Sequence, residues 1–132
     1  MRHRGYFLGD LDLRNLTGHG GRWFCLLSDL TYVDVDPETG REVARYTAVA
    51  GSLTNFASIP RPLWAIFPPY GKHTRAAVIH DDLCIRKTIP SREAHDLFKR
   101  MLEACRCSRF TVFAFWRAVR RLGPRFDGAE VA

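Results

Sequence analysis

The chain has 132 residues, with 20 lysines and arginines against 14 acidic residues, a formal net charge of +6 and a hydrophobic content of 46%. This composition excludes a disordered chain, and no apolar run approaches the roughly 20 residues that cross a bilayer, which excludes a helical membrane protein. The length predicts a single domain over residues 1–132.

Residues 1–50 are typical of strands and turns. An apolar run at 23–27, an alternating segment at 31–36 and a β-branched, aromatic segment at 42–50 each predict a strand. Turn-forming residues at 36–40 separate the last two strands. We therefore expect an antiparallel β-hairpin or small sheet. The first residues contain no apolar core of a signal peptide and the four cysteines form no C-x-x-C pair, so we expect a cytoplasmic protein with reduced thiols.

Residues 51–73 form a connector rich in proline and aromatic residues. Proline removes a backbone donor and restricts the preceding residue, which excludes a long helix or a central strand here. The aromatic content is too high for a solvated linker. We expect an extended segment that covers the core.

Residues 74–123 are predicted to be three helices, followed by a loose tail at 124–132. Thr74, Ser91 and Ser108 are candidate caps for helices that end near Arg86, near Ala104 and at the Gly-Pro pair that follows Leu122. Strands followed by three helices predict an α+β fold.

His80 lies in the middle of the apolar face of the first predicted helix, among small residues, and Asp81 borders that face. This placement favours one of two roles. His80 is either a catalytic base beside a cation-binding Asp81, or a hydrogen-bonded core histidine with Asp81 as a local ion-pair partner. The dipeptide alone does not choose between them.

A zinc site is a further interpretation of the same helix. His80 and Cys84 are spaced i, i+4, so that with His95 or Asp96 they would offer four-coordinate Zn²⁺ a set of ligands. The ordinary alternative is that Cys84 is a buried thiol in the core.

Asp96 lies away from the apolar stripe of the second helix. Its periodicity predicts a solvated acid near the helix amino terminus. The functional alternative is that Asp96 reaches His80 from a neighbouring helix and orients it, which would make a catalytic dyad.

The third helix has an apolar side and a basic side, on which Arg117, Arg120 and Arg121 lie. Such a side would bind nucleic-acid phosphates, anionic lipid or an acidic protein, or would simply be solvated. We take these three arginines as the candidate partner-binding residues.

Four motifs in fixed order resemble one family. They are GSLTNFASIPR at 51–61, PPYGK at 68–72, AAVIHDDLC at 76–84 and SREAHD at 91–96. Together they resemble a family of small phage and prophage proteins catalogued as domain of unknown function 1353. The resemblance implies a phage gene, often near tail or lysis genes, whose product lies in the host cytoplasm during assembly and then in the phage particle.

Two residues depart from the pattern of that family, which has Asp at Asn55 and Tyr at Cys84. If the Asp were a ligand or base, Asn55 would keep its shape and lose its charge. Ser58 is a weaker candidate nucleophile near His80, because it lacks a nucleophile elbow and fits a packed turn.

The His-Asp pair on one helix also resembles small phospholipases, in which the Asp and a glycine-rich loop hold calcium. His80, Asp81 and Asp96 are similar in order and type, but the glycine-rich loop is missing and Lys72 would repel a cation. A divalent cation, Ca²⁺ or Zn²⁺, is therefore only a candidate cofactor.

The favoured function is a virion or tail-assembly component that contacts other phage structural proteins as an oligomer or assembly member. One alternative is a hydrolase of lipid, peptide or peptidoglycan, in which His80 activates water, Asp96 orients it and Asp81 binds a cation. The second alternative is a nucleic-acid-binding accessory protein that uses the basic third helix.

Overall fold

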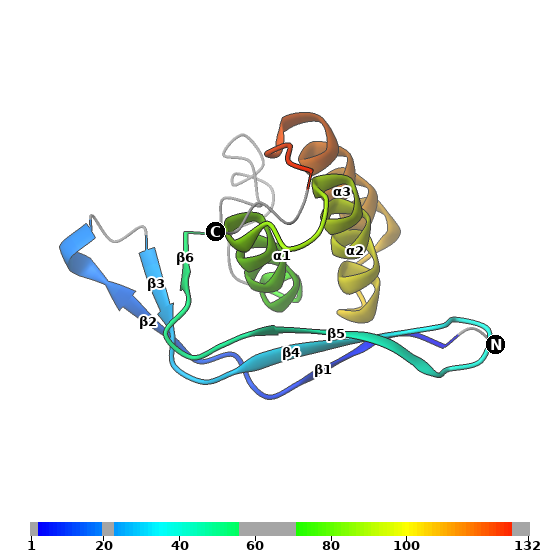
Figure 1. Ribbon diagram of the computed structural model, residues 1–132, viewed down its shortest axis with the longest axis horizontal. Helices are drawn as coiled ribbons and strands as arrows, with labels where there is room; N and C mark the ends of the chain where they lie inside the picture. Colours follow the sequence, from blue (N-terminus) through cyan, green and yellow to red (C-terminus); the bar gives the residue numbers. More distant parts are fainter. Residues whose placement is uncertain (1–2, 20–22, 56–70, 128–132) are drawn as a thin grey trace.

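The fold is α+β, with strands in two small antiparallel sheets followed by three helices (Figure 1). The computed structural model describes residues 3–19, 23–55 and 71–127. Most of the predicted connector and the last five residues lie outside these ranges. The predictions that the connector covers the core, and that Ser58 lies near His80, therefore fall outside the described residues.

The strands are β1 (Tyr6–Leu8), β2 (Leu13–Leu16), β3 (Trp23–Leu26), β4 (Leu30–Val35), β5 (Glu42–Ala48) and β6 (Leu53–Thr54), with a short 3-10 helix η1 (Thr17–His19) between β2 and β3. The helices are α1 (Thr74–Arg86), α2 (Ser91–Ala104) and α3 (Arg109–Leu122). In the described part of the chain, no helix has both the length and the hydropathy that spanning a membrane would require.

The first sheet has the order β1-β4-β5 and contains the predicted hairpin. β4 and β5 pair antiparallel from Leu30 opposite Ala48 to Val35 opposite Glu42. In the turn between them the side chain of Asp36 accepts a hydrogen bond from the backbone N–H of Glu38. Such local bonding by Asp is the reason that this residue favours turns, and the hairpin prediction is confirmed.

The second sheet has the order β2-β3-β6 and lies at one end of the first (Figure 1). The sequence pattern predicted β3 but neither β2 nor the two-residue β6. Thr54 in β6 pairs with Phe24 in β3 and is buried against α1. This short strand thus fixes the chain beside the first helix.

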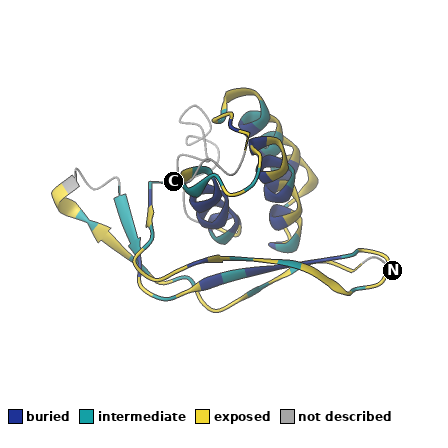
Figure 2. Ribbon diagram, in the orientation of Figure 1, coloured by how far each residue is buried: buried dark blue, intermediate teal, exposed yellow. Residues whose placement is uncertain are grey.

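α1 is the central helix, and it is buried almost all round because β4, β5, β6 and α2 surround it (Figure 2). Asp82 is only 8% exposed and pairs with Arg86. α2 and α3 are amphipathic as predicted, and α3 packs on α2 away from the first sheet (Figure 1).

Only one of the three predicted helix caps is confirmed. Ser108 accepts a hydrogen bond from the backbone N–H of Thr111 at the start of α3. Thr74 and Ser91 are the first helical residues rather than caps, and their hydroxyls accept from the backbone N–H groups of Gly71 and Phe126 instead. These two hydroxyls therefore fasten neighbouring chain segments to the helices.

The core joins the first sheet to all three helices. Its largest fully buried side chains are Tyr32, Phe98, Phe115, Leu26, Leu30, Ile79, Leu97, Met101, Leu102 and His80. Phe98 of α2 stacks on the imidazole of His80 with ring centroids 4.5 Å apart. A polar ring thus occupies the centre of the apolar core.

Candidate functional site

The helices border two polar sites. The first consists of the buried His80 and His95 and the half-buried Cys84, which together we call the histidine cluster. α1 supplies His80 and Cys84, and α2 supplies His95. The Nε2 atom of His80 lies 2.8 Å from Nδ1 of His95. The Nε2 atom of His95 lies 3.1 Å from the carbonyl oxygen of Pro124.

The hydrogen bonds of the cluster fix the proton positions of the neutral rings. Because a carbonyl oxygen only accepts, Nε2 of His95 carries a proton and donates it to Pro124. Nδ1 of His95 is then an acceptor, so Nε2 of His80 is the donor between the rings. We assign the tautomers from this network.

Both imidazoles are neutral under physiological conditions. Burial, with a smaller contribution from the neighbouring His95 ring, lowers the pKa of His80 to about 3. Burial also lowers the pKa of His95, against the opposing effect of its bond to the Pro124 carbonyl. Since a general base works best with a pKa near the working pH, these rings suit ligation better than proton transfer.

Cys84 completes the cluster, with Sγ 3.7 Å from Nε2 of His80. Burial, together with the nearby Asp81 carboxylate, raises the pKa of its thiol to about 12. A cavity of about 310 Å³ adjoins the cluster. It is lined by Trp23, Asn55, His80, Asp81, Cys84, Ile85, Val119, Leu122, Gly123 and Pro124.

Asp81 faces β6 and not the two histidines. Its Oδ2 atom accepts hydrogen bonds from the hydroxyl of Thr54 at 2.5 Å and from the backbone N–H of Asn55 at 3.2 Å. The carboxylate therefore joins α1 to β6. The cation-binding role of Asp81 stays a prediction, and the side chain of Asn55 lines the cavity.

Asp96 does not lie at His80, and the predicted hydrogen bond between them is not formed. Its carboxylate accepts from the indole of Trp116 at 3.1 Å and from Arg120 at 3.3 Å. The reason is helical geometry: one residue along α2 is a rotation of about 100°, so His95 faces α1 while Asp96 faces α3. His95 takes the place predicted for Asp96.

The predicted arginines of α3 lie on its outer side. Arg120 pairs with Asp96 and lies over the ring of Trp116, and Arg117 lies over the ring of Phe113. Phe113 is 52% exposed. The outer side of α3 therefore carries an exposed aromatic side chain beside its arginines.

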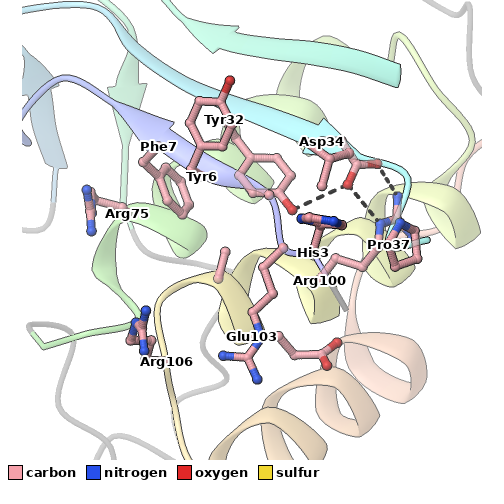
Figure 3. A pocket seen from close by; sticks show the side chains of 14 residues that line it. His3, Tyr6, Phe7, Tyr32, Asp34, Pro37, Arg75, Arg100, Glu103 and Arg106 are labelled. Carbon is pink, nitrogen blue, oxygen red and sulfur yellow. Dashed lines mark hydrogen bonds and ion pairs between the residues drawn. The ribbon is translucent and has the colours of Figure 1, made fainter. Parts of the chain in front are cut away.

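The second polar site is a pocket of about 1050 Å³, which we call the arginine pocket (Figure 3). It lies between β1, β4 and the carboxyl-terminal half of α2. Its lining comprises His3, Arg4, Gly5, Tyr6, Phe7, Tyr32, Asp34, Val35, Pro37, Arg75, Arg100, Glu103, Ala104 and Arg106. Periodicity gave no signal for this pocket, because its arginines come from separate segments.

One ion pair anchors the wall of the arginine pocket. Arg100 donates to both carboxylate oxygens of Asp34, at 3.0 and 3.3 Å, and the hydroxyl of Tyr32 also donates to Asp34 (Figure 3). Burial and the Asp34 carboxylate raise the pKa of Tyr32, so its hydroxyl stays protonated.

The remaining arginines of the pocket differ from Arg100. Arg4, Arg75 and Arg106 make no ion pair with any residue in the ranges that the structure describes. Arg75 lies over the ring of Phe7 at 4.8 Å from its centroid. Arg106 has a backbone φ of 61°, in the left-handed region that favours glycine.

Comparison with known proteins gives one match. The family described as protein of unknown function (DUF1353) matches residues 24–119. Those residues include most of β3, all of β4, β5, β6, α1 and α2, and most of α3. No curated protein and no solved structure matches the chain.

Proposed function

The chain belongs to the DUF1353 family, and we propose that it is a component of a phage virion or tail assembly that binds an acidic segment of a partner protein. One observation carries the proposal. The arginine pocket holds three arginines, Arg4, Arg75 and Arg106, that have no acidic partner among the described residues.

The chemistry of the pocket supports an acidic peptide as its occupant. Four arginines line it against two acids, Asp34 and Glu103, and Asp34 is already paired with Arg100. A guanidinium binds a carboxylate through two parallel hydrogen bonds. The rings of Phe7 and Tyr32 add apolar walls, whose centroids lie 5.1 Å apart.

A protein partner suits this pocket better than nucleic acid does. Sequence-tolerant binding of single strands uses exposed aromatic rings on which bases stack. The ring of Phe7 is instead covered by the guanidinium of Arg75. Binding is also favoured over acid-base catalysis, since His80 is fully buried and does not contact Asp96.

The experiment measures incorporation into particles. Phage particles and assembly intermediates are purified from a host that carries the gene in its native phage or prophage, and the protein is quantified by mass spectrometry. We expect the folded Arg75→Glu/Arg106→Glu variant to fall at least about tenfold below wild type. Loss of two charged contacts is enough for such a change.

A matched variant separates the pocket from general charge. Arg14→Glu/Arg92→Glu makes the same change in net charge at two exposed sites outside both cavities, and it should be incorporated normally. Arg117→Glu/Arg121→Glu tests the outer side of α3 in the same way. Circular dichroism and thermal unfolding establish that each variant is folded.

Three results would contradict the proposal. They are absence of the wild-type protein from particles, normal incorporation of the folded pocket variant, and loss of incorporation only in the α3 variant. DNA binding at about 0.1 M salt that the pocket variant loses would instead favour the nucleic-acid function. Fluorescence anisotropy with labelled single- and double-stranded DNA measures that binding.

A further inference from the structure

We propose that the histidine cluster binds one Zn²⁺ ion through Nε2 of His80, Nδ1 of His95 and Sγ of Cys84. The three ligand atoms all lie within 4.8 Å of one another, and they are the sole such group of three that the described residues contain. The inference is independent of the partner-binding function.

Two of the distances between ligand atoms are close to those of a tetrahedral site. Zinc bonds of about 2.0 Å to nitrogen and about 2.3 Å to sulfur place ligand atoms roughly 3.3 to 3.6 Å apart. Cys84 Sγ already lies 3.7 Å from His80 Nε2. The two ring nitrogens, now 2.8 Å apart, must open by about 0.5 Å to admit the ion.

The hydrogen bonds of the two rings also suit a metal ion. Neutral imidazoles are the ligating form of histidine, and the tautomers assigned above direct the lone pair of His95 Nδ1 at His80 Nε2. On binding, the proton of His80 moves from Nε2 to Nδ1 and the thiol of Cys84 loses its proton to solvent. One proton is therefore released for each Zn²⁺ bound, and no redox change occurs.

The surroundings of His95 resemble the support that metal-binding histidines usually have. Its other nitrogen donates to the carbonyl of Pro124, which fixes the ring orientation and leaves Nδ1 directed at His80. The same carbonyl connects the end of α3 to the cluster. A metal ion would replace the hydrogen bond between Nε2 of His80 and Nδ1 of His95.

The adjoining cavity supplies the fourth coordination position. Both His80 and Cys84 line its volume of about 310 Å³, so an ion held between them would face it. Three protein ligands and one open position are typical of zinc that binds water or an exchangeable donor. Asp81 and Asn55 line the same cavity.

The test uses the purified full chain, freed of metal by a chelator and then titrated with Zn²⁺ and with Co²⁺. We expect one ion per chain by native mass spectrometry and a thiolate-to-metal charge-transfer band with Co²⁺. Cys84→Ser should abolish the band and weaken Zn²⁺ affinity at least about tenfold, measured by competition with a chromophoric chelator. Cys107→Ser, at a half-buried cysteine outside the cluster, should change neither.

The proposal is overturned if wild type binds no stoichiometric Zn²⁺, if the Co²⁺ spectrum has no thiolate band, or if the two cysteine variants behave alike. If Cys84→Ser does not fold, His95→Gln takes its place, with the same expected loss of affinity. Zn²⁺ should also raise the melting temperature of wild type, because it binds only the folded site. These measurements need no partner, so failure of the partner-binding function would leave them unaffected.

Discussion

The histidine cluster and the arginine pocket are both polar and both border α2. They differ in the charge and the solvent exposure of their polar groups. In the cluster the groups are buried and neutral, and the two histidines bond each other and a backbone carbonyl. In the pocket the groups are charged and reach solvent, and one buried carboxylate, Asp34, is paired with Arg100. The cost of burying charge explains the difference.

The difference indicates what each region can bind. A neutral, enclosed pair of rings has lone pairs to offer a metal ion, and its geometry is fixed by the core around it. Unpaired guanidinium groups at an open pocket keep most of their hydration until a carboxylate arrives. The cluster is thus suited to an ion, and the pocket to a macromolecule.

The largest expected effect is the loss of stability in His80→Ala. The substitution leaves a cavity beside Phe98 and removes the donor to Nδ1 of His95. We expect the free energy of unfolding to fall by about 3 kcal/mol or more, measured by urea unfolding of metal-free protein. Arg75→Ala in the pocket should cost under about 1 kcal/mol. If both variants lost the same free energy of unfolding, the two regions would not differ in their contribution to stability.

His80 of the histidine cluster should make the stability of the protein depend on pH. The folded-state pKa of His80, about 3, lies below its unfolded value of roughly 6.5. Below pH 6.5 the unfolded chain binds a proton that the folded chain does not, so stability falls with falling pH until about pH 3. His80 alone should account for about 2 kcal/mol between pH 7 and pH 5.

Urea unfolding of metal-free protein at several pH values measures this slope. His80→Gln should flatten it. Stability that stays constant from pH 7 to pH 5 in wild type would show that His80 gains its proton in the folded protein.

A smaller effect is expected at the ion pair of the pocket. Arg100→Ala leaves Asp34 with the hydroxyl of Tyr32 but no cation. Since the Arg100 side chain is 45% exposed, solvent screens the pair and the loss should be about 1 kcal/mol. A double-mutant cycle with Asp34→Asn measures the coupling. A coupling near zero would mean that the pair contributes nothing to stability.

The smallest effect has the opposite sign. Arg106→Gly relieves a left-handed backbone conformation and should raise the free energy of unfolding by about 0.5 to 1 kcal/mol. It also removes one pocket arginine, so incorporation into particles should fall while stability rises. The matched control is Lys87→Gly, at the left-handed residue after α1. It should also raise the free energy of unfolding, but it should leave incorporation into particles unchanged. A destabilised Arg106→Gly variant would show that the guanidinium contributes to the fold.

Local patterns predicted the larger elements well. Alternation and turn chemistry gave the β4–β5 hairpin, and helical periodicity gave α1, α2 and α3 with their ends. β1, β2 and β6 were missed because segments of three, four and two residues hold too little periodicity to detect. Their positions depend on the strands and helices that they pair with.

The candidate residues were partly predictable. His80 and Cys84 share a face of one helix by spacing alone, and the sequence left His95 and Asp96 as equal candidates for the third position. The packing angle of α2 decided between them, because it turns His95 toward α1 and Asp96 toward α3. No property of either residue taken alone carries that information.

By itself the sequence determined the α+β order of elements, the apolar faces of α2 and α3, and the positions of His80 and Cys84 on one helix, because these follow from contacts between near neighbours. Only the tertiary structure decided which histidine meets His80, and that Arg4, Arg75 and Arg106 share a pocket. Such groupings join segments distant in the chain, and they arise from the packing of whole helices and sheets.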